Sequence, residues 1–141
     1  MSDPDILPVL TAGAPAPGGH YTQAIVHGGL VYVSGQLPTV VGAPHDPGAP
    51  FETQLRRVLA NLDAILAASG SGPDRLLKVT AYIVGGANWP AFNRLYAEHL
   101  GETRPARSVV PVPELHYGYL VEIDAIAAQR PASPSGTEPT A

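Results

Sequence analysis

Two short runs near the end of the chain combine strand-like alternation with isolated charges, and they constrain the fold more than any other feature. Residues 104–110 place Arg107 among apolar neighbours, and residues 121–127 place Glu122 and Asp124 in the same way. Alternating β-branched residues predict two strands, each with a buried face. A charge is buried in such a strand only where a protein partner or a ligand pairs with it. Arg107 and Glu122 are therefore the first candidates for functional residues.

The periodicity of the rest of the chain predicts a domain of ββαβαββ order. The elements that precede the two charged strands are strands over 21–26 and 30–34, a helix from Phe51, a strand over 76–84 and a helix capped by Asn88. Gly28 and Gly29 supply the positive φ that a tight hairpin needs between the first two strands. The first helix has a single apolar stripe, and the strand over 76–84 is apolar almost throughout, as expected of a strand covered on both faces.

Two helical crossovers predict a mixed sheet with both helices on one face. Nothing in the chain is then left to cover the other face, although it carries apolar residues, so the pattern predicts an oligomer. At 141 residues the chain suits one domain, expected over 19–128. A flexible arm is expected over 1–18, with docking of residues 6–10 left open, and a disordered tail over 129–141.

Composition excludes several classes of protein. The net charge is −4 with only eight Lys and Arg, which opposes nucleic-acid binding because binding needs a basic surface. There is no apolar run of about 18 residues, so no membrane span is expected. The N-terminus has no signal-peptide pattern and the chain has no cysteine, so a cytoplasmic location is the default expectation.

The sequence also predicts no metal and no cofactor. The five histidines form neither an H-x-x-x-H nor an H-E-x-x-H pair, so a zinc site is not expected. No G-x-G-x-x-G or Walker loop occurs, and Ser34 does not lie in the G-x-S-x-G frame of a nucleophile elbow.

Five motifs in order resemble the RidA/YjgF family, whose older name is L-PSP, over roughly residues 12–128. They are Gly19-His20-Tyr21-Thr22-Gln23-Ala24 after Ala14-Pro15, Ser34-Gly35-Gln36-Leu37-Pro38, Asn61-Leu62 with Ile65-Leu66, Phe92-Asn93-Arg94-Leu95-Tyr96, and Pro105-Ala106-Arg107-Ser108 followed by Glu122. Each motif alone is weak, but the five together in this order are specific. The sequence departs from the family at Val109, where members of the best-known type have a cysteine.

The resemblance implies a homotrimer of chorismate-mutase-like subunits with sites in the clefts between them, and an enamine/imine deaminase that needs no cofactor. Arg107 would bind the carboxylate of a small substrate, because its planar guanidinium fits a carboxylate in two hydrogen bonds. Glu122 would transfer protons. The matching family positions add Tyr21 and Asn93 as substrate-binding residues. Ser34 and Gly35 are two further substrate-binding candidates, because they offer a hydroxyl group and a backbone that a ligand can approach closely.

Three alternatives remain open at this point. Arg107 could instead form a structural salt bridge with Glu122 or Asp124. The protein could bind a small ligand on the same trimeric fold without catalysis, because fold does not determine function. Ribonuclease activity, a label that the family has carried, is opposed by the acidic charge. Tyr117 and Tyr119 are further candidates to close the cleft, without support from a family motif.

Overall fold

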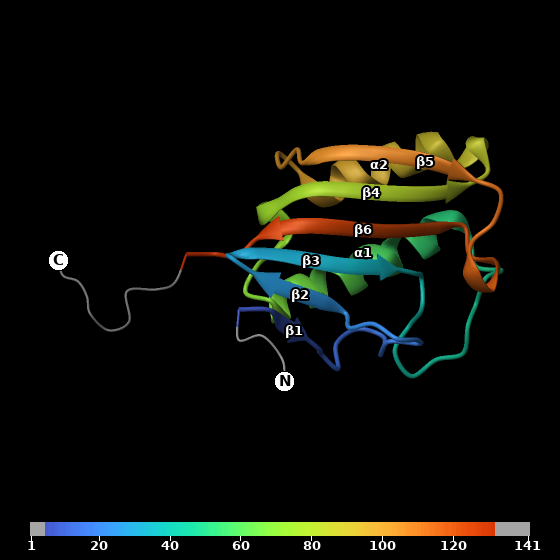
Figure 1. Ribbon diagram of the computed structural model, residues 1–141. Coiled ribbons are helices and arrows are strands. Elements are labelled where there is room, and N and C mark those ends of the chain that lie inside the picture. The colour runs from blue at the N-terminus through green and yellow to red at the C-terminus, as the bar shows by residue number, and fades with distance from the viewer. Residues whose placement is uncertain (1–4, 132–141) are drawn as a thin grey trace.

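The computed structural model describes residues 5–131 and has the α+β architecture that the sequence predicts (Figure 1). Its strands form one mixed sheet in the order β1-β2-β3-β6-β4-β5. The strands are β1 (Leu7–Val9), β2 (Ala24–His27), β3 (Leu30–Gln36), β4 (Leu76–Val84), β5 (Ala106–Val112) and β6 (Val121–Ala128), and the helices are α1 (Phe51–Ala68) and α2 (Trp89–Leu100).

The predicted hairpin and crossovers are confirmed. Gly28 and Gly29 have φ of 59° and 80° in the turn between the antiparallel strands β2 and β3. β3 and β4 are both antiparallel to β6, so they run parallel to each other, and β4 pairs with β5 in parallel. Both helices lie behind the sheet in Figure 1. The apolar stripe of α1 packs there, with Leu55, Val58 and Ile65 fully buried.

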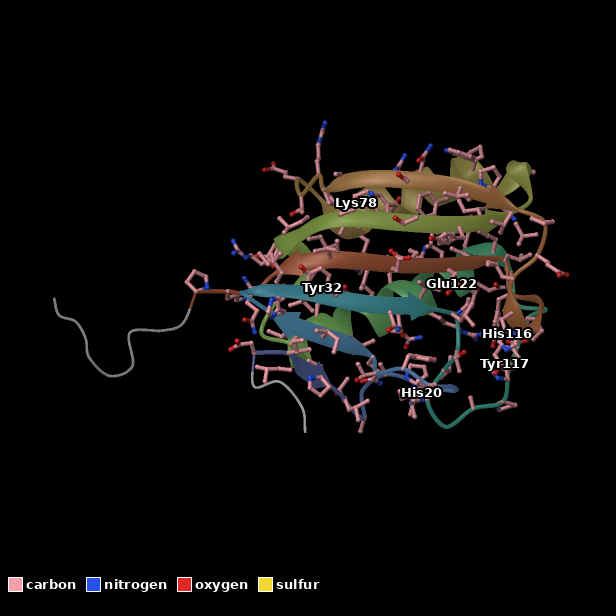
Figure 2. All side chains as sticks on the ribbon, in the orientation of Figure 1. His20, Tyr32, Lys78, His116, Tyr117 and Glu122 are labelled. Atoms are coloured by element: carbon pink, nitrogen blue, oxygen red, sulfur yellow. The ribbon has the colours of Figure 1, made fainter. Side chains whose placement is uncertain are left out.

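The face of the sheet opposite the helices stays uncovered within the described chain. We refer to it as the open face. Tyr32 and Val110 on this face are 40% and 38% exposed, and Figure 2 shows Tyr32, Lys78 and Glu122 on the side turned toward the viewer. An uncovered face with large apolar side chains favours association. The homotrimer stays a prediction.

The N-terminal segment is partly folded onto the sheet, which differs from the flexible arm predicted over 1–18. β1 pairs antiparallel with β2 and becomes an edge strand. The buried Gln23 holds the residues that follow: its Oε1 accepts the N–H of Thr11 at 2.6 Å, and its Nε2 donates to the carbonyls of Thr11, Ala14 and Pro15. A buried amide side chain needs such partners, so one glutamine fixes this segment.

Two residues of the predicted tail over 129–141 also belong to the fold. Gln129 and Arg130 each donate a backbone N–H to a turn carbonyl at 2.8 Å. Arg130 also forms an ion pair with Asp74 at 2.7 Å. The folded domain therefore continues past the predicted end at residue 128. The rest of the predicted tail, from residue 132, lies outside the described residues, as do residues 1–4.

Asn88 precedes α2 as predicted, but its side chain does not cap the helix. Asn88 lies in a 3-10 turn with φ −84° and ψ −7°, whereas a side-chain cap needs an extended backbone. Its Nδ2 instead donates to the carbonyl of Val84 at 2.9 Å. The asparagine thus ties the end of β4 to the start of α2.

Two buried amide side chains on α1 hold the long loop over 37–50. Asn61 donates to two carbonyls at the start of the loop, at 3.0 and 2.7 Å. Gln54 donates to two carbonyls near its end, and its Oε1 accepts the N–H of Leu120 at 2.8 Å. Gln54 therefore connects this loop to the segment just before β6. The two segments are fixed relative to each other through the helix.

We predict that Gln54→Leu lowers the free energy of unfolding by about 2–3 kcal/mol, because leucine fills the space but leaves buried backbone groups without partners. Arg56→Leu, an exposed change on the same helix, should shift it by less than about 0.5 kcal/mol. Urea unfolding of both variants and the wild type measures the difference. Equal midpoints for all three proteins would show that the Gln54 hydrogen bonds do not stabilise the fold.

Candidate functional site

A glutamate at the start of β6 lies against a glycine on the open face. Pairing between β3 and β6 shifts at a bulge between Val33 and Gln36, and Gly35 lies in that bulge. A Cβ built on Gly35 would overlap the carboxylate of Glu122. The close approach therefore requires glycine at this position. It places the backbone of Gly35 next to the Glu122 carboxylate, and both residues are site candidates from the sequence.

The environment of Glu122 favours its protonated form. Burial, and then the Asp124 carboxylate on the same face, raises the pKa of Glu122, while His116 opposes the shift. Burial also raises the pKa of Asp124, although Tyr82 and Lys78 act against it. The Tyr82 hydroxyl donates to Asp124 Oδ2 at 3.4 Å. A half-buried carboxyl group with a raised pKa is suited to proton transfer.

Ser34 and Tyr21 lie on the same side of the site, but they have different roles. The Ser34 hydroxyl donates to the carbonyl of Thr22 at 2.7 Å, which ties β3 to the residues before β2. The Tyr21 side chain is 53% exposed, and its hydroxyl accepts the N–H of Gly18 at 3.2 Å. Of these two predicted substrate-binding residues, Tyr21 leaves its ring exposed, while the hydroxyl of Ser34 is used within the fold.

A groove of about 420 Å³ opens beside Gly35. Its walls come from the segment before β2, the end of β3, the loop over 37–50 and the turn before β6. Tyr21, His45 and Tyr117 are among the residues that line it. The groove has the size of an ordinary small-molecule site. It adjoins the backbone against which the Glu122 carboxylate lies.

Tyr117 lines this groove, and the buried Tyr119 lies beside it. Both tyrosines are candidates from the sequence to close a cleft. Tyr119 is 1% exposed, and its hydroxyl accepts the N–H of Asp46 at 3.1 Å and lies 3.0 Å from His45 Nδ1. His45 was not predicted, because a single histidine in a Pro/Gly-rich loop has no local signal. Only the folded contact with Tyr119 reveals it.

Arg107 lies in a different place. In β5 it is the register partner of Val79, whose side chain is buried against the helices, and its guanidinium carbon lies 5.6 Å from the centre of the Phe92 ring and 5.1 Å from that of Tyr96. Both rings belong to α2. A guanidinium over aromatic rings is stabilised by cation–π attraction. The arginine is still exposed at the sheet edge.

Arg107 and Glu122 are therefore on opposite faces of the sheet. Glu122 pairs with Tyr82 and Arg107 with Val79, and positions three residues apart along β4 point to opposite faces. β4 also separates the two strands. The alternative of a salt bridge from Arg107 to Glu122 or Asp124 within one chain is thus wrong.

Asn93 and Val109 lie on α2 and β5, the two elements that carry Arg107 and the rings it contacts. Asn93 is exposed on α2, one residue after Phe92, which contacts the arginine. Val109 packs against the core on the helix side. The predicted site residues thus form two groups in one chain: Tyr21, Ser34, Gly35 and Glu122 in one, and Asn93 and Arg107 in the other. We call them the glutamate half-site and the arginine half-site.

The described residues contain no group of three or more His, Asp or Glu side chains that could hold a metal ion. They also contain no helix that is long and apolar enough to cross a membrane.

Comparisons with known proteins agree with this architecture. A family model described as Endoribonuclease L-PSP matches residues 11–129. A RutC family protein of Pyrococcus horikoshii is 38% identical over 119 residues, which cover 84% of this chain and 94% of that protein. The structure of YyfA, a Rid family protein of Yersinia pestis, has a TM-score of 0.82 and 38% identity, over 87% of this chain and 98% of that one. Escherichia coli TdcF, solved with bound serine, has a TM-score of 0.83 and 31% identity, over 88% and 99% of the two chains.

We predict that Gly35→Ala lowers the free energy of unfolding by about 1–3 kcal/mol, because the added methyl group displaces the Glu122 carboxylate from a packed position. Gly48→Ala is the control, since a Cβ there would meet no atom within 4 Å. Chemical denaturation of the two variants tests this. If Gly35→Ala is as stable as Gly48→Ala, the contact between Gly35 and Glu122 is loose.

Proposed function

Because the chain belongs to the L-PSP family, which includes the RutC and Rid proteins, we propose that it hydrolyses reactive 2-enamines and 2-imines to 2-oxo acids and ammonia. The observation that carries the proposal is the Glu122 carboxylate. It is half-buried, its pKa is raised, and it lies against Gly35 beside an open groove. A substrate with a reactive C=N carbon fits this arrangement.

The reaction needs proton transfer more than any other assistance. With the imine nitrogen protonated, water adds to the imine carbon as the Glu122 carboxylate accepts one of its protons, and a neutral carbinolamine forms. Glu122 then gives this proton to the nitrogen and the C–N bond breaks. Ammonia leaves as the C=O bond forms, and the hydroxyl proton passes to Glu122 and from there to water. The imine carbon is already electrophilic, so the scheme uses no metal and no cofactor. A carboxyl group with a raised pKa can both accept and donate the proton.

The arginine half-site supplies the contact for the substrate carboxylate. Arg107 is exposed on the edge strand β5, so one copy of the chain can present it to a neighbouring copy. We propose that Arg107 of one subunit faces Gly35 and Glu122 of the next in a homotrimer. The open face supports such packing, and the relative solved with bound serine contains an amino acid that bears a carboxylate. Each complete site would then combine the two half-sites of neighbouring subunits.

The family description names an endoribonuclease, and this gives the control reaction. The net charge of −4 opposes binding to a polyanion. The test is ammonia release from freshly generated 2-iminopropanoate, after subtraction of the uncatalysed rate, beside an RNA-cleavage assay with the same preparation. Ammonia release without RNA cleavage is the expected result. RNA cleavage alone would replace the proposal, and neither activity would leave a non-catalytic ligand-binding protein.

In the same assay we predict that Glu122→Gln slows turnover by about 10²–10⁴-fold, because the amide keeps the shape of the side chain but cannot accept a proton. The wild-type rate should fall as the pH drops through the pKa of Glu122, which burial places above its ordinary value. This acidic limb should be missing from the variant. A variant with the full rate and the same pH profile would make Glu122 structural.

We also predict that two inactive variants restore each other. Arg107→Ala and Glu122→Gln should each be inactive alone, but after denaturation and joint refolding they should recover about a quarter of the wild-type rate, since a quarter of randomly formed interfaces join two unaltered residues. Light scattering of the mixture should give a trimer mass. If the mixture stays inactive although mixed trimers form, the two residues do not share a site.

A further inference from the structure

Exposed apolar side chains gather in the groove beside Gly35. Within the described residues, ten large hydrophobic side chains are more than about a third exposed, and four of them line the groove: Tyr21, Val40, Val41 and Tyr117. Scattered apolar residues on a surface need no explanation, but a concentration of them in one concavity indicates a ligand. Apart from Tyr21, the site chemistry proposed above does not use these side chains. Their role is therefore a separate question.

One wall of the groove carries two stacked rings, those of His45 and Tyr117, whose centres are 3.9 Å apart. The His116 ring does not line the groove, but it contacts Tyr117 in a tilted arrangement at the same distance. His45 is held in turn by the buried Tyr119, whose hydroxyl lies 3.0 Å from His45 Nδ1. Figure 2 shows His116 and Tyr117 together at the end of the sheet where Glu122 lies. The stack joins the loop over 37–50 to the turn before β6.

The backbone at Tyr117 is in a conformation that tyrosine rarely adopts. Its φ is 63°, and among the described residues it is the one non-glycine residue with positive φ. A bulky side chain in this region is unfavourable and persists only where its surroundings hold it. The ring stack supplies that restraint. These ring contacts hold the Tyr117 side chain at the rim of the groove, where it is 47% exposed.

A second part of the lining is also held by the fold. Val40 and Val41 are 40% and 52% exposed in the loop over 37–50. The loop is anchored just before them, because Asn61 on α1 donates to the carbonyls of Leu37 and Thr39. A wall that is already ordered costs little conformational entropy when a ligand binds.

The groove carries no charged side chain. None of the residues that line it is Asp, Glu, Lys or Arg, and its polar groups are hydroxyl, amide, imidazole and backbone groups. A charged substituent would lose its hydration there without gaining an ion pair. An apolar substituent would instead be removed from water on several sides. The lining of the groove therefore favours an apolar substituent over a charged one.

We propose that this groove is a subsite for a large apolar side chain of the substrate, so that the protein favours 2-imino acids with aromatic or branched side chains over 2-iminopropanoate. The inference rests on the proposed function and extends it. Gly35 connects the two parts, because it lines the groove and also touches the Glu122 carboxylate. A substrate with its reactive carbon at Glu122 places its substituent in the groove.

The first test is equilibrium binding, which needs no catalysis. Phenylpyruvate and pyruvate, stable 2-oxo acids with a large and a small substituent, are titrated into the wild-type protein. Phenylpyruvate should bind at least about tenfold more tightly, because its ring is removed from water. Val41→Asp should reduce this ratio about tenfold by placing a charge in the groove. Tyr117→Gly removes the ring at a position whose φ suits glycine, and it should reduce the ratio similarly.

Leu10→Asp is the matched control, since Leu10 is 68% exposed but does not line the groove. Its ratio should equal that of the wild type. Equal binding of the two acids to the wild type, or a ratio that none of the groove variants changes, would overturn the subsite. Thermal melts confirm that each variant is folded.

The second test is kinetic and separates the subsite from the proposed function. An amino-acid oxidase generates the imines of phenylalanine and alanine, and kcat/KM is compared for the same variants. The ratio of the two kcat/KM values should fall in the groove variants and stay constant in Leu10→Asp. Hydrolysis of neither imine by the wild type would overturn the deaminase function, while the binding experiment would still decide the subsite.

Discussion

The insertion of β6 between β3 and β4 is the constraint on which the rest of this structure depends. Because β6 is antiparallel to both neighbours, β3 and β4 must run parallel, and a helical crossover has to connect them. β4 and β5 need a second crossover for the same reason. With right-handed connections both helices lie on one face. The other face is left open, and it is the face on which β6 presents Glu122 beside Gly35.

Features set by local periodicity could be predicted from the sequence, and features set by distant hydrogen bonds could not. The apolar stripe of α1 and the glycine pair of the hairpin are local signals, and both elements formed as expected. β1 has three residues and contains Pro8, so its sequence has no strand signal. It is ordered by pairing with β2 and by Gln23, whose side chain forms hydrogen bonds to backbone groups that lie 8 to 12 positions earlier in the chain. The backbone hydrogen bonds from Gln129 and Arg130 to distant turns could not be predicted for the same reason.

The two candidate charges differ in how well their positions could be predicted. Glu122 lies between Val121 and Ile123, both fully buried, so alternation alone places it on the other face. In β5 apolar residues occur at both odd and even positions, as the neighbours Val109 and Val110 show. Alternation cannot then say which face Arg107 occupies. The register with β4 decides it, and the rings of α2 contact the guanidinium on the face that this register gives it.

The separation of the two half-sites has an electrostatic consequence for the proposed mechanism. A guanidinium placed directly against Glu122 would lower the pKa of Glu122 and oppose the effects of burial and Asp124. In the proposed assembly the arginine instead binds the substrate carboxylate, and the two opposite charges largely cancel at the distance of Glu122. The glutamate then keeps the raised pKa that proton transfer needs while the substrate is bound. A chain with both groups on one face would satisfy its charges internally and lose this separation of anchoring from proton transfer.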